Sequence, residues 1–364
     1  MKWPDSIPAP APPLRRWLRR LQFDPTQMDL DLRAVQSGRL GPAANLLSGN
    51  LAPLESARLT SLSPPDSRLA REDRELGVEA VARGQVAVAI LAGGMATRFG
   101  GGAKGAVDIL PGQSFLGWKI TDAESWAQRL GAHIPVAIIT SFATHGALGR
   151  HLRSHGWTAT RVPQGLSLRL REDGELFRTP EGRYSPHAPG HGDAARALAQ
   201  SHWLSRARDA GVRWIVVSNV DNVGATLSTE ILGTHRRLQR PITVEVVQGN
   251  DSGGVPLRVD ERAMLVETLR LAPGQAQTLA TVSSTNTFVF DLECLAQVPP
   301  LTRLFVRKEV ENLMAVQIET LIGEWTHVHP TTFLEVDRAR RFVPVKNPAD
   351  LEAARRRLLD GPDR

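Results

Sequence analysis

The sequence predicts an α/β protein with a doubly wound, Rossmann-like sheet. Three mainly apolar runs, at Val86–Leu91, Ile134–Thr140 and Arg213–Val217, are typical of parallel strands that are buried on both faces. Segments with helical periodicity separate these runs, and strands that alternate with helices favour a doubly wound sheet. A glycine-rich stretch, 93–102, directly follows the first strand. In such sheets ligands bind at the carboxyl ends of the strands, so we expect the functional site there.

The remaining elements are predicted in order along the chain. Helices are expected at Phe115–Gly131, Thr144–His155, Asp193–Ala210, Ser228–Gln239, Glu309–Gly323 and Pro348–Leu359. Further strands, the last three with an antiparallel character, are expected at Thr158–Val162, Ile242–Gln248, Leu257–Val259, Ala263–Leu269 and Thr285–Phe290. Residues 165–190 are polar and contain Gly and Pro, which predicts a long connection with a functional role.

Residues 1–80 differ from the rest and predict a helical, Pro-rich N-terminal extension ahead of a main domain at 81–364. They contain Pro-rich pieces at 8–13 and 64–65 and no strand-like run. Apolar residues with arginines between them fall at helical spacing at Leu14, Trp17, Leu18 and Leu21. We expect this amphipathic helix to dock its apolar side on the main domain, although a basic helix is also compatible with membrane or nucleic-acid contact.

Composition excludes several classes of protein. The chain has 364 residues, of which 41% are apolar and 23% charged, and this mix excludes wholesale disorder. The single cysteine, Cys294, excludes a disulfide framework and a multi-cysteine zinc site. No apolar run approaches the roughly 20 residues that span a bilayer, and residues 1–20 lack a signal-peptide core, so a soluble cytoplasmic protein is expected. The net charge of +6 suits anionic small molecules or nucleic acid.

The segment after the first strand carries the strongest chemical signal. Five glycines lie in the stretch Gly93–Gly102. Glycines let backbone N–H groups approach phosphate oxygens, because no Cβ stands in the way. Arg98 can bind a phosphate through two parallel hydrogen bonds, and Lys104 adds a compact positive charge. The spacing matches neither the Walker motif nor G-x-G-x-x-G, so the segment predicts a phosphate-binding loop of another type.

Two further segments carry polar residues at strand or helix ends. Asp221 follows the strand at 213–217 and could hold Mg²⁺, which prefers oxygen ligands and bridges phosphates. Asn219 and Asn222 could orient a nucleotide or a sugar, although Asp and Asn also begin turns and cap helices. In Pro189-Gly-His-Gly-Asp193 the glycines beside His191 permit close approach of a ligand, and Asp193 could instead cap the following helix.

Taken together and in this order, these segments resemble the UDP-sugar pyrophosphorylase family, and most closely its eukaryotic-type UTP–glucose-1-phosphate uridylyltransferase branch. The resemblance covers roughly residues 85–350. It rests on the glycine loop, the two segments above, and shorter matches at Ser63–Asp66, Gly253–Gly254, Leu265–Glu267, Ser284–Asn286, Val316–Thr320 and Phe342–Leu351. It implies a nucleotide-diphospho-sugar transferase type of fold, GT-A-like, with a nucleotidyltransferase catalytic domain at 81–364. The chain departs from some family members in that it ends soon after Leu351, so no C-terminal β-helix domain is expected.

The resemblance also implies a reaction and a set of roles. UMP would pass from UTP to a sugar-1-phosphate, first of all glucose-1-phosphate, with pyrophosphate as the second product, Mg²⁺ as cofactor and no nucleic-acid or membrane partner. Arg98, Lys104 and Lys346 would be catalytic through their positive charge, and Asp221 would bind the metal. Met95–Gly100 would wrap the β- and γ-phosphates. The implied substrate-binding residues are Leu91, Ala92, Gly93, Gly94, Gln164, Gly190, His191, Asn219, Gly254, Glu267 and Asn286.

Some positions depart from the glucose branch and keep alternatives open. Ala92 and the pair Lys104-Gly105 look like the N-acetylglucosamine branch, and Thr287-Phe288 replaces a second Asn of the glucose branch. A UDP-N-acetylglucosamine pyrophosphorylase or a broad-specificity UDP-sugar pyrophosphorylase is therefore the alternative enzyme. A nucleic-acid-binding protein and a non-catalytic UDP-sugar sensor are the alternatives from other classes. The sequence leaves the oligomeric state, the number of metal ions and the role of residues 1–80 open.

Overall fold

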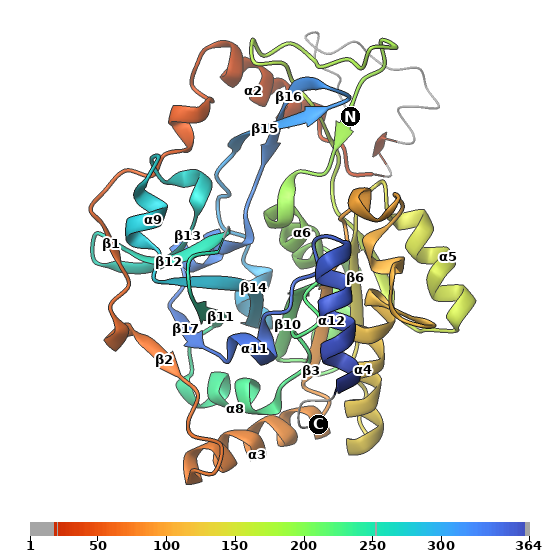
Figure 1. Ribbon diagram of the computed structural model, residues 1–364, viewed down its shortest axis with the longest axis vertical. Helices are drawn as coiled ribbons and strands as arrows, with labels where there is room; N and C mark the ends of the chain where they lie inside the picture. The colour runs from red at the N-terminus through yellow and green to blue at the C-terminus, as the bar shows by residue number, and fades with distance from the viewer. Residues whose placement is uncertain (1–17, 20, 252, 361–364) are drawn as a thin grey trace.

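An eight-stranded mixed sheet runs through the centre of the molecule (Figure 1), whose computed structural model describes residues 18–19, 21–251 and 253–360. Neighbouring strands are parallel except that β14 is antiparallel to β10 and to β11. The strands in spatial order are β2 Leu59–Ser61, β17 Thr331–Glu335, β11 Ile242–Gln248, β14 Val282–Asp291, β10 Trp214–Asn219, β3 Val86–Leu91, β6 Val136–Thr140 and β7 Thr160–Pro163. This arrangement confirms the predicted doubly wound α/β sheet.

Alternate residues of the central strands face two separate apolar cores. In β3, Val88 and Ile90 join one core, and Ala87 and Ala89 join the other. One core is covered by α3 Arg68–Ala82, α4 Phe115–Leu130, α5 His145–His155, α8 Thr229–Leu238 and α12 Pro348–Asp360. The other is covered by α6 Gly190–Ala199, α7 His202–Asp209 and α10 Leu292–Ala296. Burial on both faces explains why these strands lack a polar–apolar alternation.

The predicted helix at Glu309–Gly323 is wrong. This region forms a hairpin of β15 Leu304–Val310 and β16 Leu313–Glu319. Glu311 and Asn312 connect the strands with φ values of 50° and 62°, a left-handed pair that is typical of tight hairpin turns. Val316 and Ile318 belong to the same apolar cluster as residues of the N-terminal helix α2, Pro25–Gln36, so partners far away in the sequence stabilise the hairpin.

Two other differences concern helix ends and a missed strand. The predicted helix at Asp193–Ala210 is divided into α6 and α7, because the Ser201 side chain accepts a hydrogen bond from the N–H of Leu204 and caps a new helix. Strand β17 was not predicted. The long connection at residues 165–190 contains only the short strands β8 Ser167–Leu168 and β9 Pro186–His187.

The N-terminal region contains strands, so the expectation of none is wrong. Strand β2 extends the main sheet beside β17, and β1, Leu51–Pro53, forms a three-stranded sheet with β12 Gly254–Val259 and β13 Arg262–Glu267. The helix expected at 14–21 and the Pro-rich piece at 8–13 lie largely or wholly outside the described residues. Helix α3 continues across residue 80, and the division of the chain at that position stays a prediction.

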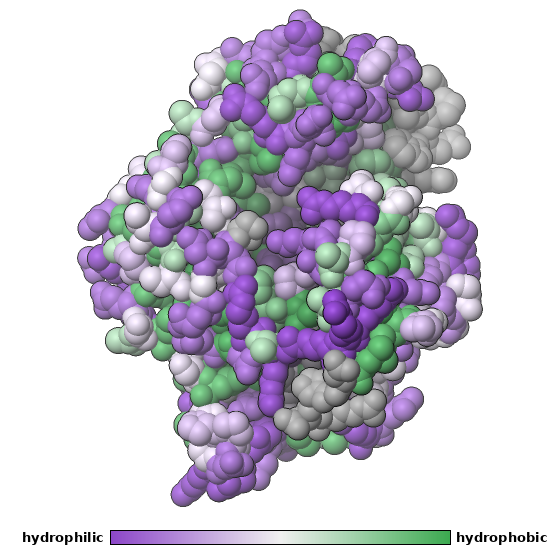
Figure 2. Space-filling model, in the orientation of Figure 1, coloured by the Kyte–Doolittle hydropathy of each residue, from purple (hydrophilic) through white to green (hydrophobic). Residues whose placement is uncertain are grey.

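Short elements complete the chain. They are β4 Asp108–Leu110, β5 Gln113–Ser114, α9 Gln275–Leu279 and α11 Arg338–Arg341. Among the described residues, no helix combines the length and the apolar character that crossing a membrane requires. Figure 2 shows that one face of the molecule is hollowed below the β15–β16 hairpin, with hydrophilic side chains around the hollow.

Candidate active site

The parallel strands β3 and β10 end side by side. Leu91 and Asn219 are partners in the register of the two strands. The glycine loop leaves β3 at this edge, and the segment Val220–Leu227, called here the Asp221 loop, leaves β10. The N–H of Val220 donates to the carbonyl of Leu91 at 3.0 Å and holds the two loops together at their start. The sheet therefore brings the predicted phosphate loop and Asp221 to one place.

The glycine loop folds back on itself. Met95 and Ala103 form an isolated antiparallel bridge, and the N–H of Lys104 donates to the carbonyl of Gly94 at 3.1 Å. Three consecutive residues at its tip, Gly100–Gly102, have φ values of 85°, 99° and 80°. Residues with a side chain rarely adopt this left-handed backbone conformation, so the turn requires glycine. The exposed tip carries only backbone, as a phosphate-binding loop needs.

Lys104 and Asp221 form an ion pair between the two loops. The Lys104 Nζ lies 2.5 Å from the Asp221 Oδ2, and the two side chains are only 13% and 21% exposed. Partial burial strengthens the attraction between the charges. Two residues that the sequence placed at separate points thus meet at the centre of the site.

A first cavity, of about 320 Å³, lies beside this ion pair. It is lined by Leu91, Gly93, Gly94, Lys104, Ile139, Gln164, Ala188, Gly190, His191, Ala194, Asn219, Val220 and Asp221. The Gln164 amide donates to the carbonyl of Gly190 at 3.2 Å. A Cβ on Gly93 would lie 2.6 Å from the Gln164 Oε1, so glycine at this position allows Gln164 to approach the loop.

A second cavity, of about 240 Å³, adjoins the first and shares His191, Asn219 and Asp221 with it. Its lining comprises His191, Asn219, Asp221, Asn222, Gly253, Gly254, Glu267, Ser284, Thr285, Asn286, Phe342, Pro344 and Lys346. Thirteen of the fifteen predicted catalytic, substrate-binding and metal-binding residues therefore line one or both cavities, and the two that do not are Ala92 and Arg98.

Glu267 and His191 face each other in the second cavity. The His191 Nε2 lies 3.8 Å from the Glu267 Oε1, and its Nδ1 accepts a hydrogen bond from the N–H of Ile322 at 3.0 Å. Burial lowers the pKa of His191 to about 4, so the neutral ring carries its proton on Nε2, toward Glu267. Burial, and then the neighbouring charge of Glu319, raise the pKa of Glu267 to about 7. This end of the site therefore disfavours negative charge.

Asn219 and Asn286 join the ends of β10 and β14. The Asn286 Nδ2 donates to the Asn219 Oδ1 at 2.8 Å. Asn286 has a φ of 55°, and the register between β11 and β14 shifts beside it, between Val244 and Val246. Such irregularities re-aim side chains next to functional sites. The irregularity thus turns Asn286 toward the cavity that Asn219 also lines.

Two predicted residues lie outside the linings. Ala92 is fully buried, and both of its backbone polar groups bond within the protein, to Ile139 and Thr144. Arg98 is exposed at the rim, with its Nη1 3.5 Å from the carbonyl of Lys346. Arg98 therefore connects the glycine loop to the segment that carries Lys346.

Sequence reasoning missed the residues that support these cavities. Ser141 and Thr144 donate to the carbonyls of Gly93 and Ala92 at 2.8 and 3.1 Å and fix the start of the glycine loop. They follow β6, so their position after a buried strand was a usable signal. Glu319, whose charge contributes to the raised pKa of Glu267, was missed because the β15–β16 hairpin was wrongly predicted as a helix.

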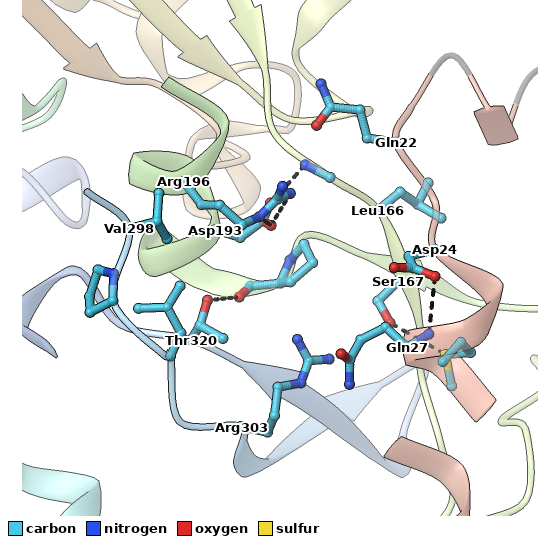
Figure 3. A pocket seen from close by; sticks show the side chains of 15 residues that line it. Gln22, Asp24, Gln27, Leu166, Ser167, Asp193, Arg196, Val298, Arg303 and Thr320 are labelled. Carbon is cyan, nitrogen blue, oxygen red and sulfur yellow. Dashed lines mark hydrogen bonds and ion pairs between the residues drawn. The ribbon is translucent and has the colours of Figure 1, made fainter. Parts of the chain in front are cut away.

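A third cavity, of about 350 Å³, has Leu166, Asp193 and Arg196 among its lining residues (Figure 3). On its wall the Asp193 carboxylate accepts from the N–H of Gly165 at 2.7 Å and pairs with Arg196 at 2.6 Å. Asp193 therefore links helix α6 to the loop that follows Gln164, a role that differs from the helix cap considered from the sequence.

The described residues contain no group of three or more His, Cys, Asp or Glu side chains that could hold a metal ion. Asp221 is the carboxylate that both cavities share. Mg²⁺ is commonly held by one or two carboxylates together with substrate phosphates and water. A single carboxylate at the junction of two cavities fits that mode of binding.

Comparison with known proteins decides the family. The model of the UTP–glucose-1-phosphate uridylyltransferase family matches residues 55–360. The chain belongs to this family. It is 23% identical over 370 residues to a UTP–glucose-1-phosphate uridylyltransferase from Musa acuminata, a match that covers 92% of this chain and 77% of the relative.

Two solved structures share the fold. A UDP-glucose phosphorylase from Trypanosoma brucei matches with a TM-score of 0.75 and 23% identity, over 93% of this chain and 77% of that one. A uridine diphosphate N-acetylglucosamine pyrophosphorylase from the same organism matches with a TM-score of 0.71 and 18% identity, over 96% and 85%. These likenesses confirm the predicted nucleotide-sugar transferase type of fold.

Proposed function

We propose that this chain is a UTP–glucose-1-phosphate uridylyltransferase, which transfers UMP from UTP to glucose-1-phosphate and releases pyrophosphate. The observation that carries the proposal is the position of Lys104 and Asp221 at the junction of two adjoining cavities. The glycine loop and Gln164 border the first cavity, which suits a nucleotide. Glu267, Asn286 and Lys346 border the second, which suits a sugar phosphate.

The chemistry requires two anions to approach each other. A phosphate oxygen of the sugar-1-phosphate attacks the α-phosphorus of UTP, a new P–O bond forms, and the bond to pyrophosphate breaks. The attacking phosphate is already ionised at neutral pH, so no general base and no covalent enzyme intermediate are needed. Catalysis then consists of positioning and of neutralising charge.

Each positively charged residue would act on a different phosphate. Lys104 would neutralise the α-phosphate, Lys346 would bind the phosphate of the acceptor, and Arg98 would stabilise the leaving pyrophosphate at the rim. Before substrate binds, Lys104 and Asp221 satisfy each other. Asp221 would hold Mg²⁺, which supplies charge neutralisation on the phosphates when it is bound.

The test is a measurement of UDP-sugar and pyrophosphate formation from UTP with a panel of sugar-1-phosphates, in Mg²⁺ and in EDTA. We expect turnover with glucose-1-phosphate that needs the metal. Absence of any UDP-sugar product with the whole panel would refute the proposal. A cytoplasmic location is part of the same proposal.

N-acetylglucosamine-1-phosphate is the second candidate acceptor, since Ala92 and Lys104-Gly105 look like that branch. Thr287 and Phe288, the other departure from the glucose branch, are fully buried and line neither cavity, so they do not select the sugar by direct contact. The same panel separates the two acceptors by their relative kcat/KM.

A further inference from the structure

The Asp221 loop pairs with the segment Arg341–Val345, which directly precedes Lys346. The N–H of Val345 donates to the carbonyl of Asp221 at 2.9 Å, and the N–H of Val223 donates to the carbonyl of Val343 at 3.2 Å. This short antiparallel pairing joins the part of the site that carries the shared carboxylate to the part that carries the lysine.

The Asn222 side chain forms the centre of this pairing. It is 1% exposed. Its Oδ1 accepts from the N–H of Val343 at 2.9 Å and from the N–H of Gly224 at 3.3 Å, and its Nδ2 donates to the carbonyl of Arg341 at 3.0 Å. These contacts direct the amide to backbone, so the substrate-orienting role considered from the sequence gives way to a role between two protein segments.

The Asp221 loop has other supports, which the segment 341–345 does not share. The Lys119 Nζ donates to the carbonyl of Ala225 at 2.5 Å, and the Asp122 carboxylate accepts from the N–H of Leu227 at 2.7 Å. Both supporting side chains come from α4.

The segment 341–345 has its own anchor at its start, where Arg341 pairs with Glu245 at 2.6 Å and donates to the carbonyl of Thr226 at 2.9 Å. The Asn222 amide binds Val343, which lies between this anchor and Lys346. Loss of the amide should therefore act on the part of the segment that leads to Lys346.

We propose that Asn222 is a positioning residue that sets the place of Lys346 and thereby the affinity for the phosphate of the acceptor. The inference rests on the proposed function, because it assigns the acceptor phosphate to Lys346. It predicts a selective defect: weaker use of the sugar phosphate, with use of UTP nearly unchanged.

The experiment compares Asn222→Ala, Lys346→Ala and the double variant in the full chain. We expect Asn222→Ala to raise the KM for glucose-1-phosphate on the order of tenfold and the KM for UTP by less than about twofold. In the Lys346→Ala background the same substitution should have little further effect, because both act through one contact.

Asn45 offers a matched control. It is also buried, and its amide likewise joins backbone, donating to the carbonyl of Phe305 at 2.7 Å and accepting from its N–H at 2.8 Å. Asn45→Ala should lose comparable stability without the selective change in KM. If Asn222→Ala does not fold, Asn222→Asp, which keeps the acceptor and loses the donor, takes its place.

Four outcomes are informative. Independent, multiplying effects of the Asn222 and Lys346 substitutions overturn the inference, and so does an equal rise in both KM values. Amide hydrogen exchange at Val343 and Val345 should accelerate in Asn222→Ala, and unchanged exchange also overturns it. A folded wild-type chain without uridylyl transfer refutes the proposed function, and the exchange measurement still tests the contact by itself.

Discussion

Lys104 offers the most direct test of the site, through Lys104→Ala. Its Nζ lies 2.5 Å from Asp221 and its side chain is 13% exposed, so water screens its charge only partly. With an effective dielectric of about 20, a unit charge about 4 Å from a phosphate contributes up to about 4 kcal/mol. Part of that attraction also acts on bound substrate, so we expect kcat to fall by roughly 10²- to 10³-fold.

The assay is steady-state pyrophosphate release from UTP and glucose-1-phosphate, with circular dichroism to confirm folding. Lys308→Ala is the control, because it removes an exposed lysine that lines neither cavity. Lys104→Arg should recover part of the rate, since the charge returns with a different shape. A folded Lys104→Ala protein with a near-normal kcat would refute the role of the lysine.

The other predictions concern the metal, the pH dependence and the packing. Asp221→Ala should abolish Mg²⁺-dependent turnover in a folded protein, and a titration of activity against Mg²⁺ checks this; an unchanged titration contradicts the assignment. The pKa of Glu267 is about 7 in the folded protein and 4.5 ordinarily. The free energy of unfolding therefore falls as the pH rises from 4.5 to 7, because the folded state must hold a charged, buried carboxylate. Glu267→Gln should therefore gain stability relative to the wild type by up to about 3 kcal/mol at pH 8 and little at pH 4.5, measured by denaturant unfolding. A Cβ on Gly233 would lie 1.6 Å from the carbonyl oxygen of Asp73, so Gly233→Ala should force α3 and α8 apart and cost about 1–3 kcal/mol, seen as a lower Tm.

The central strands were predictable because a strand that is buried on both faces requires a continuous run of apolar residues. β3 is buried on both faces, and its bounds, Val86–Leu91, agree with the prediction. The hairpin β15–β16 was not predictable in this way. Its alternation is blurred by exposed Leu313 and Met314, and its buried residues find their partners on α2, which is far away in the sequence.

The site shows the same division. Lys104 and Asp221 each follow a strand with a strong pattern, so their meeting could be expected from two parallel neighbours. The orientation of Asn222 could not be predicted from the sequence, because its partners Arg341 and Val343 lie more than a hundred residues later. Local patterns placed the residues on the right edge, and only the folded chain shows which of them face each other.

The distribution of charge in the two cavities is consistent with separate groups binding the phosphates and the sugar. Lys104 and Asp221 form an ion pair at the junction, and burial raises the pKa of Glu267, in the second cavity, to about 7. An arriving phosphate adds negative charge near Glu267 and would favour its neutral form further. A neutral carboxyl can donate a hydrogen bond to a sugar hydroxyl and does not repel the phosphate. Under the proposed function, the cations would act on the phosphates, while groups that carry little charge would hold the sugar.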